Sequence, residues 1–312
     1  MSTILVTGAA GFVGGHLIDR LLTKGASIVG WYRPGTEVHG LRNDVRWTAV
    51  ELLDRDAIAH ALDELQPSAI YHLAAAAHVG QSWQFAYDTY RTNVLATHHL
   101  LSEVARVTRH TRVLISCSAT IYKPQERPLK EDDALAPTSP YATSKLAQEV
   151  LGARVFREEG VPVVIARAFN HTGPGQDASY VAPSLARQIA RIEAGLQEPT
   201  LRMGNLEPKR DLSDVRDVVR AYEALVSSGT PGEPYNVCSG RALSIRALVD
   251  TFLQRAKVSV DIVQDRTLFR PTDAPILVGD YGRLAATTGW KPLIPLEKTV
   301  DDLLDYWRAR AA

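Results

Sequence analysis

The segment Thr7-Gly8-Ala9-Ala10-Gly11-Phe12-Val13-Gly14 places three glycines between an apolar run and an amphipathic stretch. The apolar run, residues 4–6, predicts a strand, and residues 14–24 predict a helix. Glycine is favoured where the backbone needs a positive φ or must approach a phosphate closely. The N–H groups that open the following helix are suited to a pyrophosphate. The segment therefore predicts a dinucleotide site. Its spacing, G-x-x-G-x-x-G, is one residue longer than the common fingerprint, and a plain tight turn is the simpler alternative.

Short apolar runs alternate with helical stretches through the first half of the chain. Strands are expected at 27–31, 45–50, 69–73, 112–116 and 161–166, and helices at 55–65, 87–106 and 139–159. This βαβ order predicts an α/β fold with a doubly wound parallel sheet, the Rossmann arrangement.

The alternation is interrupted at Gly173-Pro174-Gly175. Beyond it, helices are expected at 183–195, 215–227 and 296–310, with a strand at 235–238 that returns to the sheet. We therefore expect a dinucleotide-binding domain of residues 1–169 plus about 211–243. A smaller, discontinuous α/β substrate-binding domain is expected at about 170–210 plus 244–312.

The charge balance argues against several classes of partner. The 35 basic and 35 acidic residues give a formal net charge of zero, so nucleic acid is not an expected partner. No apolar run approaches the ~18 residues of a membrane span, and no His, Cys and Asp cluster has metal-ligand spacing. The two cysteines, Cys117 and Cys238, lie in apolar contexts, which fits free thiols in a reducing cytoplasm.

The end of the second strand bears on cofactor choice. A carboxylate at this place binds a ribose 2′-hydroxyl and repels a 2′-phosphate. Here the sequence reads Val29-Gly30-Trp31-Tyr32-Arg33, without an acid. Arg33 is suited to a charge-assisted bond with a 2′-phosphate, which predicts NADP(H) over NAD(H). The alternative is a solvated surface arginine.

A second motif supplies a proton donor. Tyr141 and Lys145 are four residues apart on an expected helix and share one face of it. A neighbouring ammonium stabilises a phenolate and lowers the phenol pKa, so Tyr141 becomes a usable acid and base. Ser118 follows a strand and is placed to donate a hydrogen bond to a reacting oxygen. A chance Tyr–Lys pair is the alternative, because this spacing is common.

Taken together, these motifs resemble the extended short-chain dehydrogenases/reductases of the sugar-nucleotide type, over nearly the whole chain. The segments that carry the resemblance are 7–14, 72–75, 92–94, 116–122, 140–145 and 210–217. It implies that Ser118, Tyr141 and Lys145 form the catalytic triad, and that Lys145 also holds the nicotinamide ribose. It further implies a cofactor site of Gly8, Gly11, Phe12, Val13, Gly14, Leu73, Ala74, Ala75, Asn93 and His171, with Glu51 and Leu52 at the adenine.

The resemblance also implies substrate contacts and a homodimer. Asn170, Arg210 and Arg270 match residues that bind a nucleotide diphosphate sugar in this family, and Arg187 is a weaker match. For each arginine, a surface ion pair is the alternative. Two long helices, within about 90–106 and 140–159, form the interface in relatives.

Some segments are similar to GDP-4-keto-6-deoxy-mannose reductases. They are Ser82-Trp83, 169–176, 269–273, 277–280 and 288–292. Related GDP-mannose 4,6-dehydratases carry a glutamate two residues after the catalytic Ser or Thr, where this chain has Thr120. A threonine hydroxyl is not a useful base near neutral pH, so dehydration is disfavoured.

The resemblance thus implies NADPH-dependent reduction of a nucleotide-linked 4-keto-6-deoxyhexose, with GDP-4-keto-6-deoxy-D-mannose giving GDP-D-rhamnose or its C4 epimer. Two alternatives stay open at this point. One is an NAD-dependent 4-epimerase of a UDP- or GDP-sugar, which the Ser118-Ala119-Thr120 triplet resembles. The other is a non-catalytic NADP-binding sensor, which the Tyr–Lys pair argues against.

Overall fold

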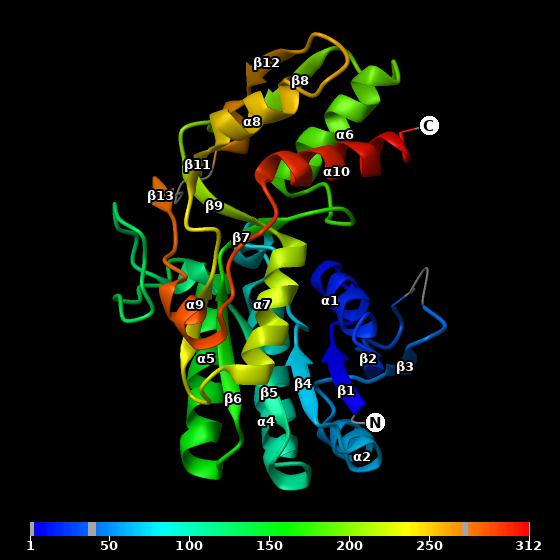
Figure 1. Cartoon of the computed structure of the whole chain (residues 1–312), viewed down its shortest axis with the longest axis vertical. Helices are drawn as coiled ribbons and strands as arrows, with labels where there is room; N and C mark the ends of the chain where they lie inside the picture. Colours follow the sequence, from blue (N-terminus) through cyan, green and yellow to red (C-terminus); the bar gives the residue numbers. More distant parts are fainter. Residues whose placement is uncertain (1–2, 37–41, 270–273, 312) are drawn as a thin grey trace.

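The computed structural model describes residues 3–36, 42–269 and 274–311. A large sheet and its helices fill the lower half of Figure 1, and a second group of helices and short strands lies above them. Among the described residues, no helix combines the length and apolar character needed to cross a bilayer.

The large sheet has seven strands in the order β10-β6-β5-β4-β1-β2-β3, and every neighbouring pair is parallel. Its strands are β1 (Thr3–Thr7), β2 (Ser27–Tyr32), β3 (Arg46–Ala49), β4 (Ala69–His72), β5 (Arg112–Ser118), β6 (Val163–Ala168) and β10 (Pro234–Val237). Strand order reverses between β1 and β4, which is where ligands bind in open α/β sheets. The register pairs Thr7 with His72 and His72 with Ile115, so the loops after β1, β4 and β5 meet at one edge.

Helices cover both faces of this sheet. Alternate strand residues point to opposite faces, and Val6 and Val164 belong to one buried cluster while Leu5 and Ile165 belong to another. The first cluster packs against α1 (Phe12–Leu22), α7 (Val215–Ser228) and α9 (Gly282–Thr288). The second packs against α2 (Arg55–Leu65), α4 (Ala96–Val107) and α5 (Pro140–Glu159). The predicted doubly wound parallel sheet is therefore confirmed.

A separate apolar cluster, which includes Leu185, Phe252 and Leu303, belongs to the group of helices and short strands that lies above the large sheet in Figure 1. That cluster lies among α6 (Val181–Glu193), α8 (Ile245–Leu253) and α10 (Leu296–Arg308). Its strands form a pair, β8 (Thr200–Met203) with β12 (Asp261–Gln264), and a small sheet of β7 (Asn170–Thr172), β9 (Lys209–Asp214), β11 (Ala242–Ser244) and β13 (Ile276–Leu277). Strand β7 begins two residues after β6 ends, so the chain passes directly from the large sheet to this part.

Local sequence explains the ends of the helices that bear on function. Helix α5 starts where the Ser139 hydroxyl accepts a hydrogen bond from Ala142 N at 3.1 Å, with Pro140 in its first turn. It ends at Gly160, whose φ of 75° suits a left-handed cap. Helix α1 starts at Phe12, two residues earlier than expected, because Gly11 is extended and serves as its N-cap.

The helix expected at 87–106 is divided. It consists of α3 (Ala86–Tyr90), a π turn (Arg91–Leu95) and α4. Such turns are rare and recur at functional sites. Three short 3-10 helices complete the described chain, namely η1 (Gln81–Trp83), η3 (Ala119–Ile121) and η4 (Arg266–Leu268).

Candidate active site

The glycine turn is shaped by close backbone contacts. Gly8 has a φ of 66°, and a Cβ there would lie 2.7 Å from Ala74 N. A Cβ on Gly14 would overlap the carbonyl oxygen of Gly8. Gly11 caps α1 without a side-chain hydrogen bond, and the first turn of that helix carries no acid. Free N–H groups and an unopposed helix dipole thus face the turn, which fits a pyrophosphate.

A cavity of about 530 Å³ runs along this turn. It is lined by most of the residues expected at a cofactor, namely Gly8, Gly11, Phe12, Val13, Gly14, Arg33, Leu73, Ala74, Ala75 and His171. Tyr32 and Thr36 line it too, and among the described residues that follow β2, up to Thr36, none carries a carboxylate. Arg33 is exposed there and makes no ion pair with any described residue. The glycine turn and the Arg33 guanidinium in one cavity therefore suit a dinucleotide with a 2′-phosphate.

Three expected cofactor residues lie outside this lining. Glu51 and Leu52 follow β3, and the Glu51 carboxylate accepts a hydrogen bond from Leu53 N at 3.0 Å. Their contact with an adenine stays a prediction. Asn93 is fully buried, and its side chain bonds both backbone groups of Ala76, accepting from N at 2.7 Å and donating to O at 3.2 Å. Asn93 thus holds the cavity wall from behind instead of lining it.

The predicted catalytic residues converge on the same cavity. Ser118 ends β5, Tyr141 lies in the first turn of α5, and Lys145 lies one turn further on. All three are buried. Lys145 Nζ donates to the Ser116 carbonyl at 2.8 Å and lies 5.9 Å from the centroid of the Tyr141 ring. The Ser118 and Thr120 hydroxyls are 3.0 Å apart.

Burial dominates the ionisation of this group. It raises the pKa of Tyr141 well above its ordinary value, while a hydrogen bond with Ser118 acts in the opposite direction. Burial also lowers the pKa of Lys145 to about 8. We expected the ammonium to lower the phenol pKa. Without bound cofactor, desolvation of the phenolate is the larger effect, so the phenol stays protonated and ready to donate.

His171 forms part of the cavity wall near the glycine turn. Its ring stacks on Phe12, with centroids 6.2 Å apart and planes inclined by 9°. Its Nδ1 lies 2.9 Å from the Phe169 carbonyl, which can only accept, so Nδ1 carries the proton. Burial lowers the pKa of His171 and keeps the ring neutral. His171 is suited to packing against a cofactor and carries no charge to offer it.

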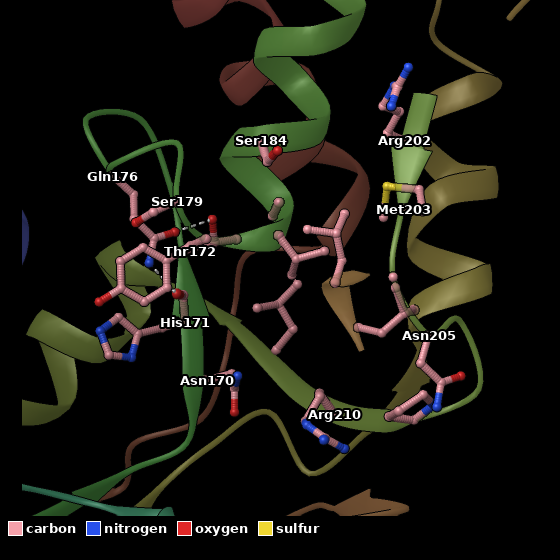
Figure 2. A pocket seen from close by; sticks show the side chains of 18 residues that line it. Asn170, His171, Thr172, Gln176, Ser179, Ser184, Arg202, Met203, Asn205 and Arg210 are labelled. Carbon is pink, nitrogen blue, oxygen red and sulfur yellow. Dashed lines mark hydrogen bonds between the residues drawn. The ribbon is translucent and has the colours of Figure 1, made fainter. Parts of the chain in front are cut away.

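A second cavity of about 330 Å³ adjoins the first (Figure 2). Asn170, His171, Gln176 and Tyr180 line both. Arg210, from β9, lines the second cavity, and its Nη1 donates to the Ala274 carbonyl at 2.8 Å. The two cavities together form one path from the glycine turn to the part of the molecule built on α6, β8 and β9.

The structure brings some predicted substrate residues to this second cavity and not others. Asn170 and Arg210 lie at one side of it, and Arg202 lies at the other (Figure 2). Arg187 is exposed on α6 and lines neither cavity, and Arg270 lies outside the described residues. Arg202 and Asn205 were not expected here, because no motif in the sequence around Gly204 marks them.

Comparison with known proteins agrees with this geometry. The sequence profile of the GDP-mannose 4,6 dehydratase family matches residues 5–303. The GDP-6-deoxy-D-mannose reductase of Pseudomonas aeruginosa is 37% identical over 310 residues, which cover 98% of this chain and 97% of the relative.

Solved structures are similar over almost the full length. The structure of RMD from Pseudomonas aeruginosa complexed with NADPH has a TM-score of 0.86 at 34% identity, covering 99% of this chain and 100% of that one. The UDP-glucose 4-epimerase of Brucella ovis in complex with NAD has a TM-score of 0.88 at 25% identity, covering 99% of each chain.

Proposed function

The chain belongs to the GDP-mannose 4,6-dehydratase family, and within it we propose that the protein is an NADPH-dependent reductase of GDP-4-keto-6-deoxy-D-mannose. The product would be GDP-D-rhamnose or its C4 epimer. One observation carries the proposal. The glycine turn, Arg33 and the group Ser118, Tyr141 and Lys145 all line one cavity, which continues into a second cavity lined by Asn170 and Arg210.

This arrangement suits a substrate that carries a carbonyl at one end and a nucleotide diphosphate at the other. Bound NADPH would supply the hydride for a carbonyl beside Tyr141. Arg202 and Arg210 would meet the nucleotide end in the second cavity, where a diphosphate needs cationic partners. Asn170 lines both cavities and would contact the diphosphate sugar between them.

The chain's own part in the reaction is to position groups and to move one proton. Tyr141, kept protonated by burial, donates its phenolic proton to the oxygen of the reduced carbonyl. Ser118 donates a hydrogen bond to the same oxygen. Lys145 stabilises the resulting phenolate through its charge and holds the ribose hydroxyls of the cofactor. The buried setting strengthens each of these electrostatic contacts.

Thr120 distinguishes this chain from a dehydratase. It lines the cavity two residues after Ser118, and its hydroxyl is engaged with the Ser118 hydroxyl. A dehydratase needs a base at this place to remove a proton from the sugar. Since a threonine hydroxyl is not such a base, reduction at C4 is favoured over elimination.

We also propose a homodimer. Several large apolar side chains are exposed on neighbouring elements, namely Trp83 on η1, Phe85 just before α3, Tyr87 and Tyr90 on α3, Leu95 on the π turn and Val150 on α5. Covering them with a second copy would bury apolar surface that is otherwise exposed to water. Sedimentation of the purified protein measures this directly.

Two further proposals follow from the sequence and the packing. The buried free thiols Cys117 and Cys238 fit a cytoplasmic location. The domain division is proposed as 1–169 plus about 211–243 for the dinucleotide and about 170–210 plus 244–312 for the substrate. Helix α9, although it falls in the second range, packs back against α7.

A panel of GDP-, UDP- and dTDP-linked 4-keto-6-deoxy sugars tests the function, with NADPH fluorescence as the measurement. We expect steady oxidation of NADPH with the GDP-linked sugar. The 4-epimerase alternative predicts instead that NAD stays bound through purification and that GDP- or UDP-sugars interconvert without net oxidation of NADPH. A protein that binds NADPH and turns over neither class of sugar would support the sensor alternative.

A further inference from the structure

A row of buried polar side chains lies behind the wall of the cofactor cavity. It runs from Thr7 at the end of β1, through His72 at the end of β4, to Thr97 on α4 and Gln148 on α5. Each of these side chains is at most 2% exposed. Buried polar groups usually have hydrogen-bond partners, so the direction of each bond can be worked out.

The Thr97 hydroxyl shows which group donates in each hydrogen bond of this row. It donates its single proton to the Asn93 carbonyl at 2.6 Å, because that oxygen can only accept. Both of its lone pairs are then left to accept. One receives Gln148 Nε2 at 2.6 Å, and the other faces His72 Nε2 at 2.8 Å. His72 Nε2 must therefore carry a proton.

The other ring nitrogen of His72 accepts. Burial and the nearby Lys145 charge lower the pKa of His72 to about 3, so the imidazole is neutral and Nδ1 has no proton. Thr7 Oγ1, 2.8 Å from Nδ1, then donates to it and in turn accepts from Ala74 N at 3.2 Å. The bonds thus run in a single direction from Ala74 N to the Asn93 carbonyl.

The two ends of this relay hold the two halves of the active site. At one end, Ala74 lies in the wall of the cofactor cavity. Near the other end, Gln148 on α5 joins the relay by donating to the Thr97 hydroxyl, and it lies one turn after Lys145. Asn93 makes a second link between the cavity wall and α5. Besides bonding the backbone of Ala76, its amide donates to the Ser144 hydroxyl at 2.9 Å, and that hydroxyl donates to the Tyr141 carbonyl at 2.7 Å.

We propose that His72 and Thr97 are positioning residues, which couple the cofactor wall at Ala74 to the catalytic helix through a relay that requires the neutral Nε2-protonated imidazole. Neither touches the reacting atoms. Their effect is to fix the separation between the bound cofactor and the pair Tyr141 and Lys145. A small misplacement of these groups lowers the rate steeply.

The substitution Thr97→Val keeps the shape of the side chain and removes the hydroxyl. We expect the apparent Kd for NADPH and kcat each to worsen by about tenfold or more, while Thr97→Ser recovers most of both. Thr111→Val is the matched control. Thr111 is also buried and its hydroxyl donates to the Pro67 carbonyl at 2.5 Å, but it lies just before β5, at the opposite edge of the sheet from the site.

The control separates positioning from stability. Both valine variants lose a buried hydrogen bond, so both should unfold more readily, and only Thr97→Val should lose NADPH affinity and kcat. Equal losses in the two variants, or an unchanged kcat and Kd in folded Thr97→Val, would overturn the proposal. The kcat measurement rests on the proposed function. If no keto sugar is reduced, that function fails while NADPH binding still tests the relay.

The tautomer can be tested without any ligand. Nitrogen-15 NMR of the free protein should show His72 with a protonated Nε2 and an unprotonated Nδ1 that does not titrate between about pH 5 and 8. The His72→Asn variant assigns the signal among the nine histidines. A proton on Nδ1, or a titration near pH 6.5, would contradict the relay.

Discussion

Lys145 should make the free protein less stable at neutral pH than a neutral side chain would. Burial lowers its pKa from 10.5 to about 8, a difference that corresponds to about 3 kcal/mol at roughly 1.4 kcal/mol for each pKa unit. Lys145→Met removes the charge and keeps the length of the side chain. It also removes the 2.8 Å hydrogen bond to the Ser116 carbonyl, which is worth about 1 kcal/mol. The expected net gain is about 2 kcal/mol.

The pH dependence of the stability gain distinguishes the removal of a buried charge from improved packing of the methionine side chain. Between about pH 8 and 10.5 the unfolded chain still holds the Lys145 proton that the folded chain has released. The unfolded state then binds more protons, so the stability of the wild type rises with pH through this window. Below about pH 8 the full cost of burying the charge is present. The advantage of Lys145→Met should therefore be full at pH 7, vanish near about pH 10 and become a loss of about 1 kcal/mol above about pH 11, where only the missing hydrogen bond counts.

Urea unfolding of the nucleotide-free protein at several pH values measures this difference. Thermal unfolding at neutral pH should show a rise of about 4 °C, since 1 kcal/mol moves the midpoint by about 2 °C in a chain of this size. Lys24→Met, at an exposed lysine near the end of α1, is the control and should change stability by less than about 0.5 kcal/mol. The reasoning is refuted if Lys145→Met is no more stable than wild type at pH 7, or if its advantage is independent of pH.

Three further predictions concern catalysis, cofactor choice and folding. Tyr141→Phe should lower kcat by about 10²- to 10⁴-fold with little change in NADPH affinity, and steady-state kinetics equal to wild type would contradict its role as the acid. Arg33→Ala should raise KM for NADPH and leave KM for NADH nearly unchanged; parallel changes in both would point to a role other than 2′-phosphate binding. Arg167→Met should destabilise the protein by about 3–5 kcal/mol, because its Nε lies 2.9 Å from the Glu149 carboxylate in the interior and the acid would be left unpaired. Urea unfolding should show much of that loss recovered when Glu149→Leu is added.

The local parts of the site could be predicted from the sequence. Helical periodicity places Tyr141 and Lys145 on one face of α5, and the strand–turn–helix pattern of the sequence places the glycines at the end of β1. The βαβ order alone fixed the parallel sheet, because parallel neighbours require such crossovers. These are short-range properties, which a single stretch of chain carries by itself.

Long-range packing decided where the other site residues lie. Asn93 was expected beside the cofactor, yet its side chain is fully enclosed between Ala76 and Ser144, from two other segments. Arg202 and Asn205 share a cavity with Asn170 because the chain after β8 leads into β9, which pairs with β7.

The ionisation of Tyr141 shows the same division between sequence and structure. The spacing to Lys145 was read correctly from the sequence, but the direction of the phenol pKa was not, since burial outweighs the charge of its neighbour. The sequence by itself determined which groups are available and which face of a helix they share. Only the tertiary structure decided how far each is removed from water, because desolvation depends on every segment packed around a group and not on its own neighbours in the chain.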